Sequence, residues 1–251
     1  NSPHFVELNM RGDIVWEYII PTNLQAYVQP GGDAELLTNG NILCVFPGAG
    51  LYELDRAGAV VWTYLDPDVP HDADRLTNGN TLMVFGDDDQ FPDAQVKEGD
   101  AQGNLVWSWK ARDYFFTAPY TSLFSQGWTH CNAASRLTNG NTLISLRNFN
   151  LTLEVNPQGV PVWSQDWSRV VSVTSTGGFM SYDPHEPLLL TNDHLLVCLQ
   201  SPSPVQVVEL DRATGQLVWQ YTRPEGLRTP RDCNRLRNGN TLILCVLTNS
   251  S

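Results

Sequence analysis

The sequence predicts an all-β fold: a five-bladed β-propeller with four-stranded antiparallel blades, forming a single domain over residues 1–251. Nineteen Gly and 16 Pro separate many short apolar runs, a composition typical of strands and turns. A Trp-containing segment occurs five times, and a second segment centred on Asn-Gly also occurs five times. Two hairpins per repeat make one four-stranded sheet, and four-stranded repeats of about 40 to 60 residues are typical of propeller blades.

The Trp segments share a Glu, a turn Gly and a Trp, and in every copy the Gly stands four residues before the Trp. We expect each to form two strands joined by a tight turn, in which Gly takes a positive φ and the Trp lies between two sheets. The copies are VELNMRGDIVWEY (6–18), LYELDRAGAVVWTY (51–64), VKEGDAQGNLVWSW (96–109), TLEVNPQGVPVWSQ (152–165) and VVELDRATGQLVWQY (207–221).

The second segment reads LLTNGNIL (36–43), RLTNGNTL (75–82 and 136–143), LLTNDHLL (189–196) and RLRNGNTL (235–242). Asn-Gly between apolar runs is a strong hairpin signal, because both residues tolerate the left-handed conformation that a type I′ turn requires. The spacing therefore predicts type I′ turns, and only Asn192-Asp193 departs from the pattern.

The chain begins with a Trp-type hairpin (5–18) and ends with an Asn-Gly hairpin (231–246). Neither hairpin makes a full blade alone. Pairing the two in one sheet would close the ring and remove exposed edges. We therefore expect a final blade built from both ends, with no domain boundary inside the chain.

Composition excludes several functions. The net charge is −12 and the 15 basic residues are scattered, which argues against a nucleic-acid partner. No run approaches the roughly 18 apolar residues of a membrane span. Five Cys without zinc-like spacing are expected to be mostly buried thiols. The first residue is Asn, and sequons begin at Asn150 and Asn249, so we expect an extracellular or periplasmic protein.

Counting back seven residues from each turn Asn gives one equivalent position per repeat. Innermost propeller strands begin near the central channel, where ligands bind, so these positions are candidate site residues: Gly32, His71, Asn132, His185 and Arg231. Four of the residues that follow them are carboxylates, which can orient imidazoles or cap strands by accepting backbone N–H groups: Asp33, Asp72, Glu186 and Asp232.

Three insertions interrupt the repeats. Residues 110–130 and 167–184 are rich in aromatic side chains and can either wall a pocket for a flat ligand or pack over the blade ends. Residues 86–100 concentrate carboxylates. Calcium binds such oxygen clusters, but the spacing matches no calcium loop, and the preferred interpretation is a solvated acidic loop.

The segment HDADRLTNGNTL (71–82), together with the repeated Glu-Leu-Asp and Val-Trp pattern, resembles the repeat of the arylsulfotransferase family of propellers, which is distantly similar to quinoprotein propellers. The resemblance covers nearly the whole chain. The family carries a Trp-x-His-x-Asn motif followed by Ser-x-Arg on the next strand. The matching residues here are Trp128, His130, Asn132, Ser145 and Arg147.

The resemblance implies a PAPS-independent aryl-sulfate sulfotransferase. In such an enzyme His130, Asn132, Arg147 and His71 contact the sulfuryl group, and His185 is transiently sulfated before a phenol accepts the group. Substrate binding is assigned to Trp128, Arg231, Tyr120 and Tyr182. The expected partners are a small aromatic sulfate and a phenol, with no cofactor and no metal.

Two other functions fit the residues. One is a non-catalytic secreted propeller, lectin-like or structural, that binds a glycan or a protein partner through its aromatic loops. The other is a glycosidase that uses two of the four channel carboxylates, which would need to lie about 5 to 10 Å apart. The sequence does not determine the oligomeric state.

Overall fold

The computed structural model describes residues 2–29, 32–170, 182–201, 206–222 and 229–246. Over these ranges it is a β-propeller with four complete four-stranded antiparallel blades and two shorter hairpins. The blades are β3 (Ala34–Leu36), β4 (Ile42–Phe46), β5 (Gly50–Leu54), β6 (Val60–Tyr64); β7 (Ala73–Arg75), β8 (Thr81–Val84), β9 (Val96–Gly99), β10 (Leu105–Trp109); β11 (Cys131–Arg136), β12 (Thr142–Leu146), β13 (Leu151–Val155), β14 (Pro161–Asp166); and β15 (Pro184–Leu189), β16 (His194–Leu199), β17 (Gln206–Asp211), β18 (Gln216–Thr222).

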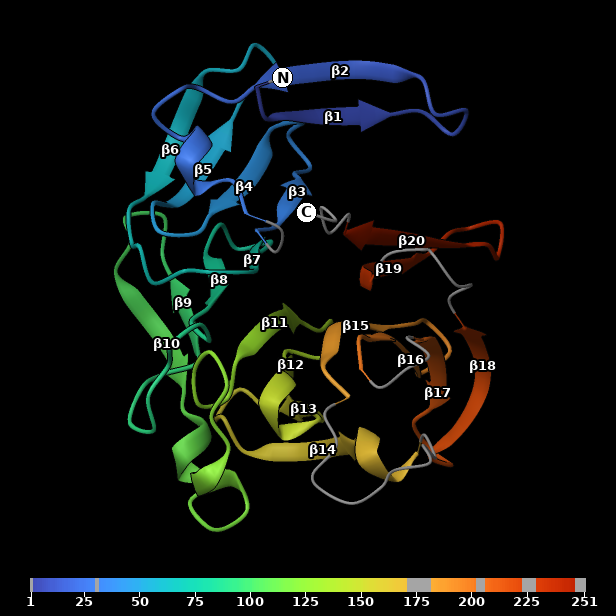
Figure 1. The fold of residues 1–251 in the computed structure, drawn as a ribbon. Helices are drawn as coiled ribbons and strands as arrows, with labels where there is room; N and C mark the ends of the chain where they lie inside the picture. Colours follow the sequence, from blue (N-terminus) through green and yellow to red (C-terminus); the bar gives the residue numbers. More distant parts are fainter. Residues whose placement is uncertain (1, 30–31, 171–181, 202–205, 223–228, 247–251) are drawn as a thin grey trace.

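The first strand of each blade lies nearest the centre of the molecule and the fourth lies outside (Figure 1). The two terminal hairpins are β1 (His4–Leu8) with β2 (Ile14–Ile19), and β19 (Thr229–Arg235) with β20 (Thr241–Val246). The helical content of the described residues is five short 3-10 turns: η1 (Gln25–Tyr27), η2 (Ala111–Asp113), η3 (Tyr120–Ser122), η4 (Arg147–Phe149) and η5 (Trp167–Arg169). None of these turns has the length and apolarity that a membrane crossing requires.

The two terminal hairpins lie on either side of a break in the ring between β1 and β20, which we call the seam. Within the described residues β1 pairs only with β2, and β20 pairs only with β19 (Figure 1). The β1–β2 hairpin packs against the β3–β6 blade through Phe5 and Trp16, and the β19–β20 hairpin packs against the β15–β18 blade through Cys233 and Ile243. The described residues thus hold four complete blades and two unjoined hairpins, and the closed five-bladed ring stays a prediction.

Apolar residues are exposed on both sides of this seam. Leu242 in β20 is 59% exposed, although its counterparts in the four complete blades are buried, at 0 to 1% exposure: Leu43, Leu82, Leu143 and Leu196. Leu8 in β1 is 55% exposed, whereas its counterpart Leu54 is fully buried. These side chains carry the repeat pattern of a blade interior without the burial that the pattern produces elsewhere.

The turns between the first two strands of each blade differ from the expected type I′ geometry. Of Asn39 and Gly40, only the Gly has a positive φ, and the N–H of Gly40 donates to the carbonyl of Leu37. The turn is thus a type I turn followed by a left-handed Gly. The side chain of Asn39 explains its recurrence, because its Oδ1 accepts the N–H of Asn41 and its Nδ2 donates to Glu53.

The repeated Glu and Trp clamp neighbouring blades together. The guanidinium of Arg136 in β11 lies 5.0 Å from the ring of Trp107 in the preceding blade, and its Nη2 donates to Glu98 Oε2 at 2.6 Å. The Trp107 indole N–H bonds onward to the carbonyl of Pro157. Arg75 and Arg235 repeat the arrangement. This confirms the expected position of the Trp between two sheets.

Two blades have Leu where the clamping Arg stands elsewhere, at positions 36 and 189. In both cases an Arg from the turn between the third and fourth strands replaces it. Arg56 lies over Trp16 and bonds Glu7, and Arg212 lies over Trp163 and bonds Glu154. The clamp is therefore kept at all five interfaces, from two different positions in the repeat.

Two further expectations concern single residues. Four of the five Cys are buried, as expected, and these four are free thiols: Cys44, Cys131, Cys198 and Cys233. Asn150 is only 1% exposed, and its Oδ1 accepts the backbone N–H of Tyr182. Its sequon is therefore not a glycosylation site in the folded protein. Asn249 lies outside the described residues.

Candidate functional site

The inner strands are irregular where they enter the centre of the ring. The pairing register shifts between Cys131 and Ala133, between His185 and Leu188, and between Pro230 and Asp232. A bulge removes the strict alternation of side chains, so consecutive residues can face the same side. This is why β15 presents both His185 and Glu186 to the centre, and β19 presents both Arg231 and Asp232.

The five equivalent positions predicted from the repeats converge on one cavity. This central cavity has a volume of about 190 Å³ and is reached by strands from every blade and from the C-terminal hairpin. The five positions therefore lie together, and their role as a binding site stays a prediction. Its lining is Gly32, Asp33, His71, Asp72, Asp74, Asn132, His185, Glu186, Arg231, Asp232 and Leu244.

His185 is held as a neutral imidazole with one nitrogen facing a cation. Its Nδ1 lies 3.2 Å from the carbonyl oxygen of Asp183, to which it must donate, so Nε2 carries the lone pair. Arg231 Nη1 lies 3.1 Å from that Nε2. Burial, followed by the charge of Arg231, lowers the pKa of His185 well below its ordinary value. The ring is therefore uncharged at neutral pH.

His130 and His71 meet across the neighbouring inner strands. Their Nε2 atoms are 3.2 Å apart, and His130 Nδ1 lies 2.7 Å from the carbonyl of Gln126, to which it donates. Burial, then the charges of His71 and Arg147, lower the pKa of His130 to about 4. At neutral pH His130 is therefore uncharged.

Asn132 lies in β11 at 1% exposure and contributes an amide to the wall of the central cavity. Its Nδ2 donates to the carbonyl of Pro184 at 2.9 Å, which ties the third blade to the fourth. Its Oδ1 has no hydrogen-bond partner among the described residues. Ser145, the Ser of the Ser-x-Arg motif, donates to the same carbonyl at 3.0 Å.

Arg147 stands at the start of η4, next to the cavity rather than in its lining. Its Nε lies 3.4 Å from Asp183 Oδ1, and its Nη1 donates to Gln126 Oε1 at 3.3 Å. Burial, then the charge of Arg147, lowers the pKa of Arg231, which places the two guanidinium groups in one electrostatic cluster with His185. Two cations beside a neutral imidazole make a site for a small anion.

Loop 86–100 contributes two residues that sequence reasoning missed. Asp87 Oδ1 lies 3.2 Å from His71 Nε2 and 3.3 Å from His130 Nδ1. Although burial opposes it, the hydrogen bond and charge of His71 lower the pKa of Asp87. Asp89 is 4% exposed and accepts the Oγ1–H and N–H of Thr129 and the N–H of His130. The expectation of a solvated acidic loop is wrong at Asp89, which is buried, whereas the side chain of Asp87 is 43% exposed.

Two close approaches hold loop 86–100 against residues 127–131. A Cβ on Gly86 would lie 2.0 Å from the backbone of Cys131, and one on Gly127, whose φ is +103°, would lie 2.3 Å from the Gly86 carbonyl. Only Gly permits this contact. In the sequence, only the run of Asp residues indicates Asp87 and Asp89, and the spacing of that run does not identify the residues that they contact.

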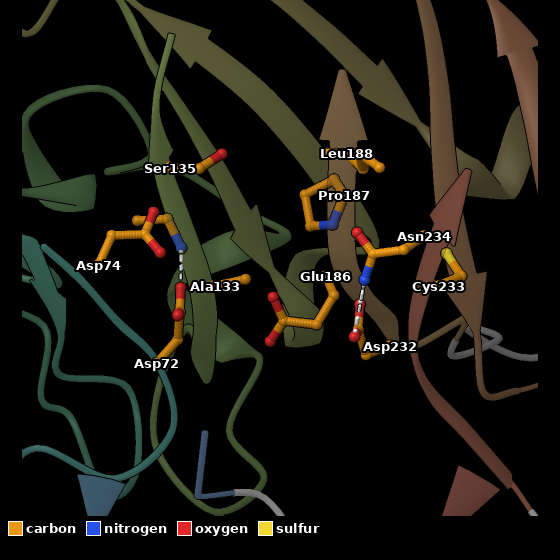
Figure 2. Close-up of a pocket in the computed structure, with 11 residues that line it drawn as sticks. Asp72, Asp74, Ala133, Ser135, Glu186, Pro187, Leu188, Asp232, Cys233 and Asn234 are labelled. Atoms are coloured by element: carbon orange, nitrogen blue, oxygen red, sulfur yellow. Dashed lines mark hydrogen bonds between the residues drawn. The ribbon is translucent and has the colours of Figure 1, made fainter. Parts of the chain in front are cut away.

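Three of the carboxylates beside the candidate site residues, Asp72, Glu186 and Asp232, line an acidic pocket of about 180 Å³ that adjoins the central cavity and also includes Asp74 (Figure 2). The fourth, Asp33, lines the central cavity itself. Burial, together with the neighbouring carboxylates, raises the pKa of Asp33 to about 6 and that of Asp74 to about 7, and it raises those of Asp72 and Glu186 well above their ordinary values. Asp72 also caps a strand by accepting the N–H of Ala134 at 2.7 Å. The pocket therefore carries fewer negative charges at neutral pH than the number of its carboxyl groups would suggest.

The aromatic residues assigned to substrate binding lie away from the central cavity. Trp128 is 3% exposed and donates its indole N–H to the carbonyl of Tyr120, while Tyr120 packs on Phe149. Tyr182 is 4% exposed, in the core of the β15–β18 blade. The structure does not bring these three side chains to the cavity wall, and residues 171–181 of the second aromatic insertion lie outside the described residues.

A larger outer pocket, of about 450 Å³, lies beside Arg147. It is lined by Ser122, Leu123, Phe124, Ser125, Arg147, Asn148 and Asp183. Phe124 is 61% exposed there. The pocket combines an apolar ring surface with one guanidinium. Asp183, which pairs with Arg147 in its wall, also accepts from His185 Nδ1 through its backbone carbonyl.

Comparison with known families supplies one match. The family model described as arylsulfotransferase (ASST) matches residues 2–164, about two thirds of the chain, including His71, His130, Asn132 and Arg147. His185 and Arg231 lie beyond the matched range. No curated protein matches the sequence.

Solved structures share the fold at low sequence identity. A protein of unknown function from Bacteroides caccae is 18% identical with a TM-score of 0.60, and the match covers 93% of this chain and 75% of that one. A streptogramin B lyase is 12% identical with a TM-score of 0.58, covering 96% and 76%. A virginiamycin B lyase from Staphylococcus aureus is 10% identical with a TM-score of 0.55, covering 97% and 77%.

Proposed function

This chain belongs to the arylsulfotransferase family, and on that premise we propose that it transfers a sulfuryl group from an aryl sulfate to a phenol through a sulfated His185. The observation that carries the proposal is the His185–Arg231 pair. A neutral imidazole whose lone pair faces a guanidinium at 3.1 Å can attack sulfur while the cation stabilises the sulfuryl oxygens.

In the first half-reaction His185 Nε2 attacks the sulfur of the aryl sulfate. The N–S bond forms as the S–O bond to the aryl group breaks, and the bonding pair leaves on the aryl oxygen as a phenolate. In the second half-reaction the oxygen of an acceptor phenol attacks the same sulfur. The N–S bond breaks, its electron pair returns to Nε2, and the phenol releases its proton to solvent.

Positive charge for both steps comes from Arg231 and Arg147, and Asn132 adds an amide to the cavity wall. The tautomer of His185 is fixed by the carbonyl of Asp183, which accepts from Nδ1 and leaves Nε2 free of a proton. The outer pocket beside Arg147 offers Phe124 and Leu123 as a surface for the aryl ring of donor or acceptor. An aryl sulfate has this combination of a flat ring and an anion.

The test is a chromogenic assay that follows 4-nitrophenol release from 4-nitrophenyl sulfate, with and without a second phenol. Wild-type protein is expected to release nitrophenol continuously only when the acceptor is present. Without it, about one equivalent per chain is released, and mass spectrometry locates one sulfuryl group on a peptide that contains His185. His185→Ala is expected to abolish both signals.

His4→Ala is the matched control, because His4 lies in β1 with a side chain 38% exposed, at the far hairpin from His185. It should keep wild-type turnover and the same sulfated peptide. Turnover retained in His185→Ala, or a sulfuryl group on another residue, would refute the proposed nucleophile. Absence of nitrophenol release from the wild-type protein would refute the transfer itself.

We also propose that the two terminal hairpins join as a fifth blade, with β1 pairing with β20. The support is the exposure of Leu8 and Leu242, whose counterparts are buried in complete blades. In a joined blade Leu242→Ala should destabilise the protein as a core truncation does, by about 2 to 5 kcal/mol. Leu105→Ala, at a site 61% exposed on an outer strand, is the control. Equal melting temperatures for the two variants would refute the joined blade.

A second function follows if transfer fails. Phe116 and Phe124 in the loop of residues 110–130 are 62% and 61% exposed, an arrangement that suits binding of a glycan or a protein partner. Glycan-array or pull-down binding that is lost in Phe116→Ala but kept in His185→Ala would support this binding role. Binding unaffected by Phe116→Ala would argue against it.

A further inference from the structure

Three potential metal ligands from separate segments meet beside the central cavity. They are His71, just before β7, Asp87, after β8, and His130, just before β11. One ligand atom from each lies within 4.8 Å of the other two. From this geometry we propose that His71, Asp87 and His130 form a binding site for one divalent transition-metal ion, with Zn²⁺ the best fit.

The spacing of the ligand atoms matches a metal polyhedron. His71 Nε2 lies 3.2 Å from His130 Nε2 and 3.2 Å from Asp87 Oδ1. Ligand atoms bound tetrahedrally at about 2.1 Å from zinc are separated by about 3.4 Å. Asp87 Oδ1 lies 3.3 Å from His130 Nδ1, so the carboxylate has to turn toward Nε2 to complete the ligand set. Three protein ligands leave a fourth position for water.

The protonation of His130 prepares it for a metal. Its Nδ1 donates to the carbonyl of Gln126 at 2.7 Å, so its Nε2 has a free lone pair that points toward His71. A backbone carbonyl that accepts from the remote ring nitrogen is the usual partner of a metal-binding His. Without an ion, the two facing Nε2 atoms need a proton between them, and a metal ion replaces that proton.

The surrounding backbone holds the cluster in place at a conformational cost. His130 and Gln126 have φ values of 47° and 54°, a region that residues other than Gly seldom occupy. Asp89 compensates by accepting the N–H of His130 and both donors of Thr129. His130 is thereby fixed against loop 86–100, which carries Asp87.

The ligand types select the metal. Two imidazoles and one carboxylate suit Zn²⁺ and its transition-metal neighbours, whereas Ca²⁺ and Mg²⁺ prefer sets made entirely of oxygen. The charge of Arg147 nearby weakens cation binding, and Asp87 is the only carboxylate of the three ligands. The affinity should therefore depend strongly on Asp87.

This inference goes beyond the proposed function and does not depend on it, because metal binding is measured directly. Protein stripped with a chelator is titrated with ZnCl₂ by calorimetry, and the bound site is characterised by the visible spectrum of Co²⁺. We expect one equivalent of Zn²⁺ per chain and a Co²⁺ spectrum of tetrahedral nitrogen and oxygen ligands. Asp87→Asn and His71→Gln should each weaken binding by more than about tenfold.

Asp88→Asn is the matched control, because it removes an exposed carboxylate from the adjacent position in the same loop. It should bind Zn²⁺ as the wild type does. Cys245→Ser controls for the one thiol that is not fully buried. The proposal is overturned if the wild type binds no Zn²⁺, if Asp87→Asn and His71→Gln bind it unchanged, or if the Co²⁺ spectrum shows thiolate charge-transfer bands.

Discussion

The contacts of Arg136 between two neighbouring blades predict how much stability the protein loses when the guanidinium is removed. In Arg136→Met the aliphatic stem is kept and the guanidinium is lost. That guanidinium donates to Glu98 Oε2 at 2.6 Å and to the Gly140 carbonyl at 3.3 Å, and it lies 5.0 Å from the Trp107 ring. Glu98 then keeps one neutral partner, the side-chain amide of Asn80 at 2.6 Å.

The cost follows from the burial of the pair. The Arg136 and Glu98 side chains are 19% and 10% exposed, between the exposed pairs that contribute about 0 to 1 kcal/mol and the buried pairs whose disruption costs about 3 to 5 kcal/mol. The contact with the Trp107 ring adds about 0.5 to 1 kcal/mol. A loss of about 2 to 3 kcal/mol is expected, which lowers the melting temperature of a chain of this length by about 4 to 10 °C.

Urea unfolding followed by Trp fluorescence, together with calorimetry, measures the change. Arg11→Met is the control, because Arg11 also pairs with a carboxylate, Asp13 at 3.1 Å, but its side chain is 83% exposed. It should leave the free energy of unfolding unchanged within error. If Arg136→Met and Arg11→Met unfold at the same urea concentration, the clamp does not hold the blades together and the reasoning fails.

Three further predictions concern the centre of the ring. Asp74 has a folded pKa of about 7 against an ordinary 3.8, so between these values the unfolded chain has lost a proton that the folded protein keeps. The free energy of unfolding should therefore fall as pH rises from about 4 to 7. Asp74→Asn should raise the melting temperature at pH 7.5 and make the free energy of unfolding less dependent on pH. Asp68→Asn, at an exposed position, should have neither effect. Gly86→Ala should displace the loop that carries Asp87, seen as loss of the Asp87-dependent Zn²⁺ binding in a chain that remains folded by circular dichroism. Arg231→Met should raise the pKa of His185, which is measured by NMR titration of the ring. The same substitution should lower nitrophenol release by about 100-fold. An unchanged His185 titration would show that the guanidinium does not act on the ring.

Much of the architecture could be predicted from the repeats. The Gly before each Trp has the predicted positive φ, and the five positions seven residues before the turns meet in one cavity. Both features are local, because a turn fixes the residue that needs a left-handed backbone, and residues equally far along the chain from equivalent turns lie at equal depth in their blades. The type I′ assignment failed because the Asn acts through its side chain, bonded to Asn41 and Glu53 in the first blade, rather than through its backbone.

The candidate site was likewise predicted only in part from the sequence. The resemblance supplied His71, His130, Asn132, Arg147 and His185, which the structure gathers in or beside the central cavity. It did not supply their partners: Asp87, Asp89, Gln126 and Asp183. These lie in segments that vary from blade to blade, so no periodic position marks them.

The sequence by itself determined the number of repeats, their strand order and the side chains that point to the axis, because these follow from short-range turn chemistry and the two-residue period of a strand. Only the tertiary structure decided how far the ring is closed, which ring nitrogen of His185 is free, and which carboxylates keep their protons. Those properties depend on desolvation and on contacts between distant segments, such as that of Gly86 with Cys131, which no spacing along the chain encodes.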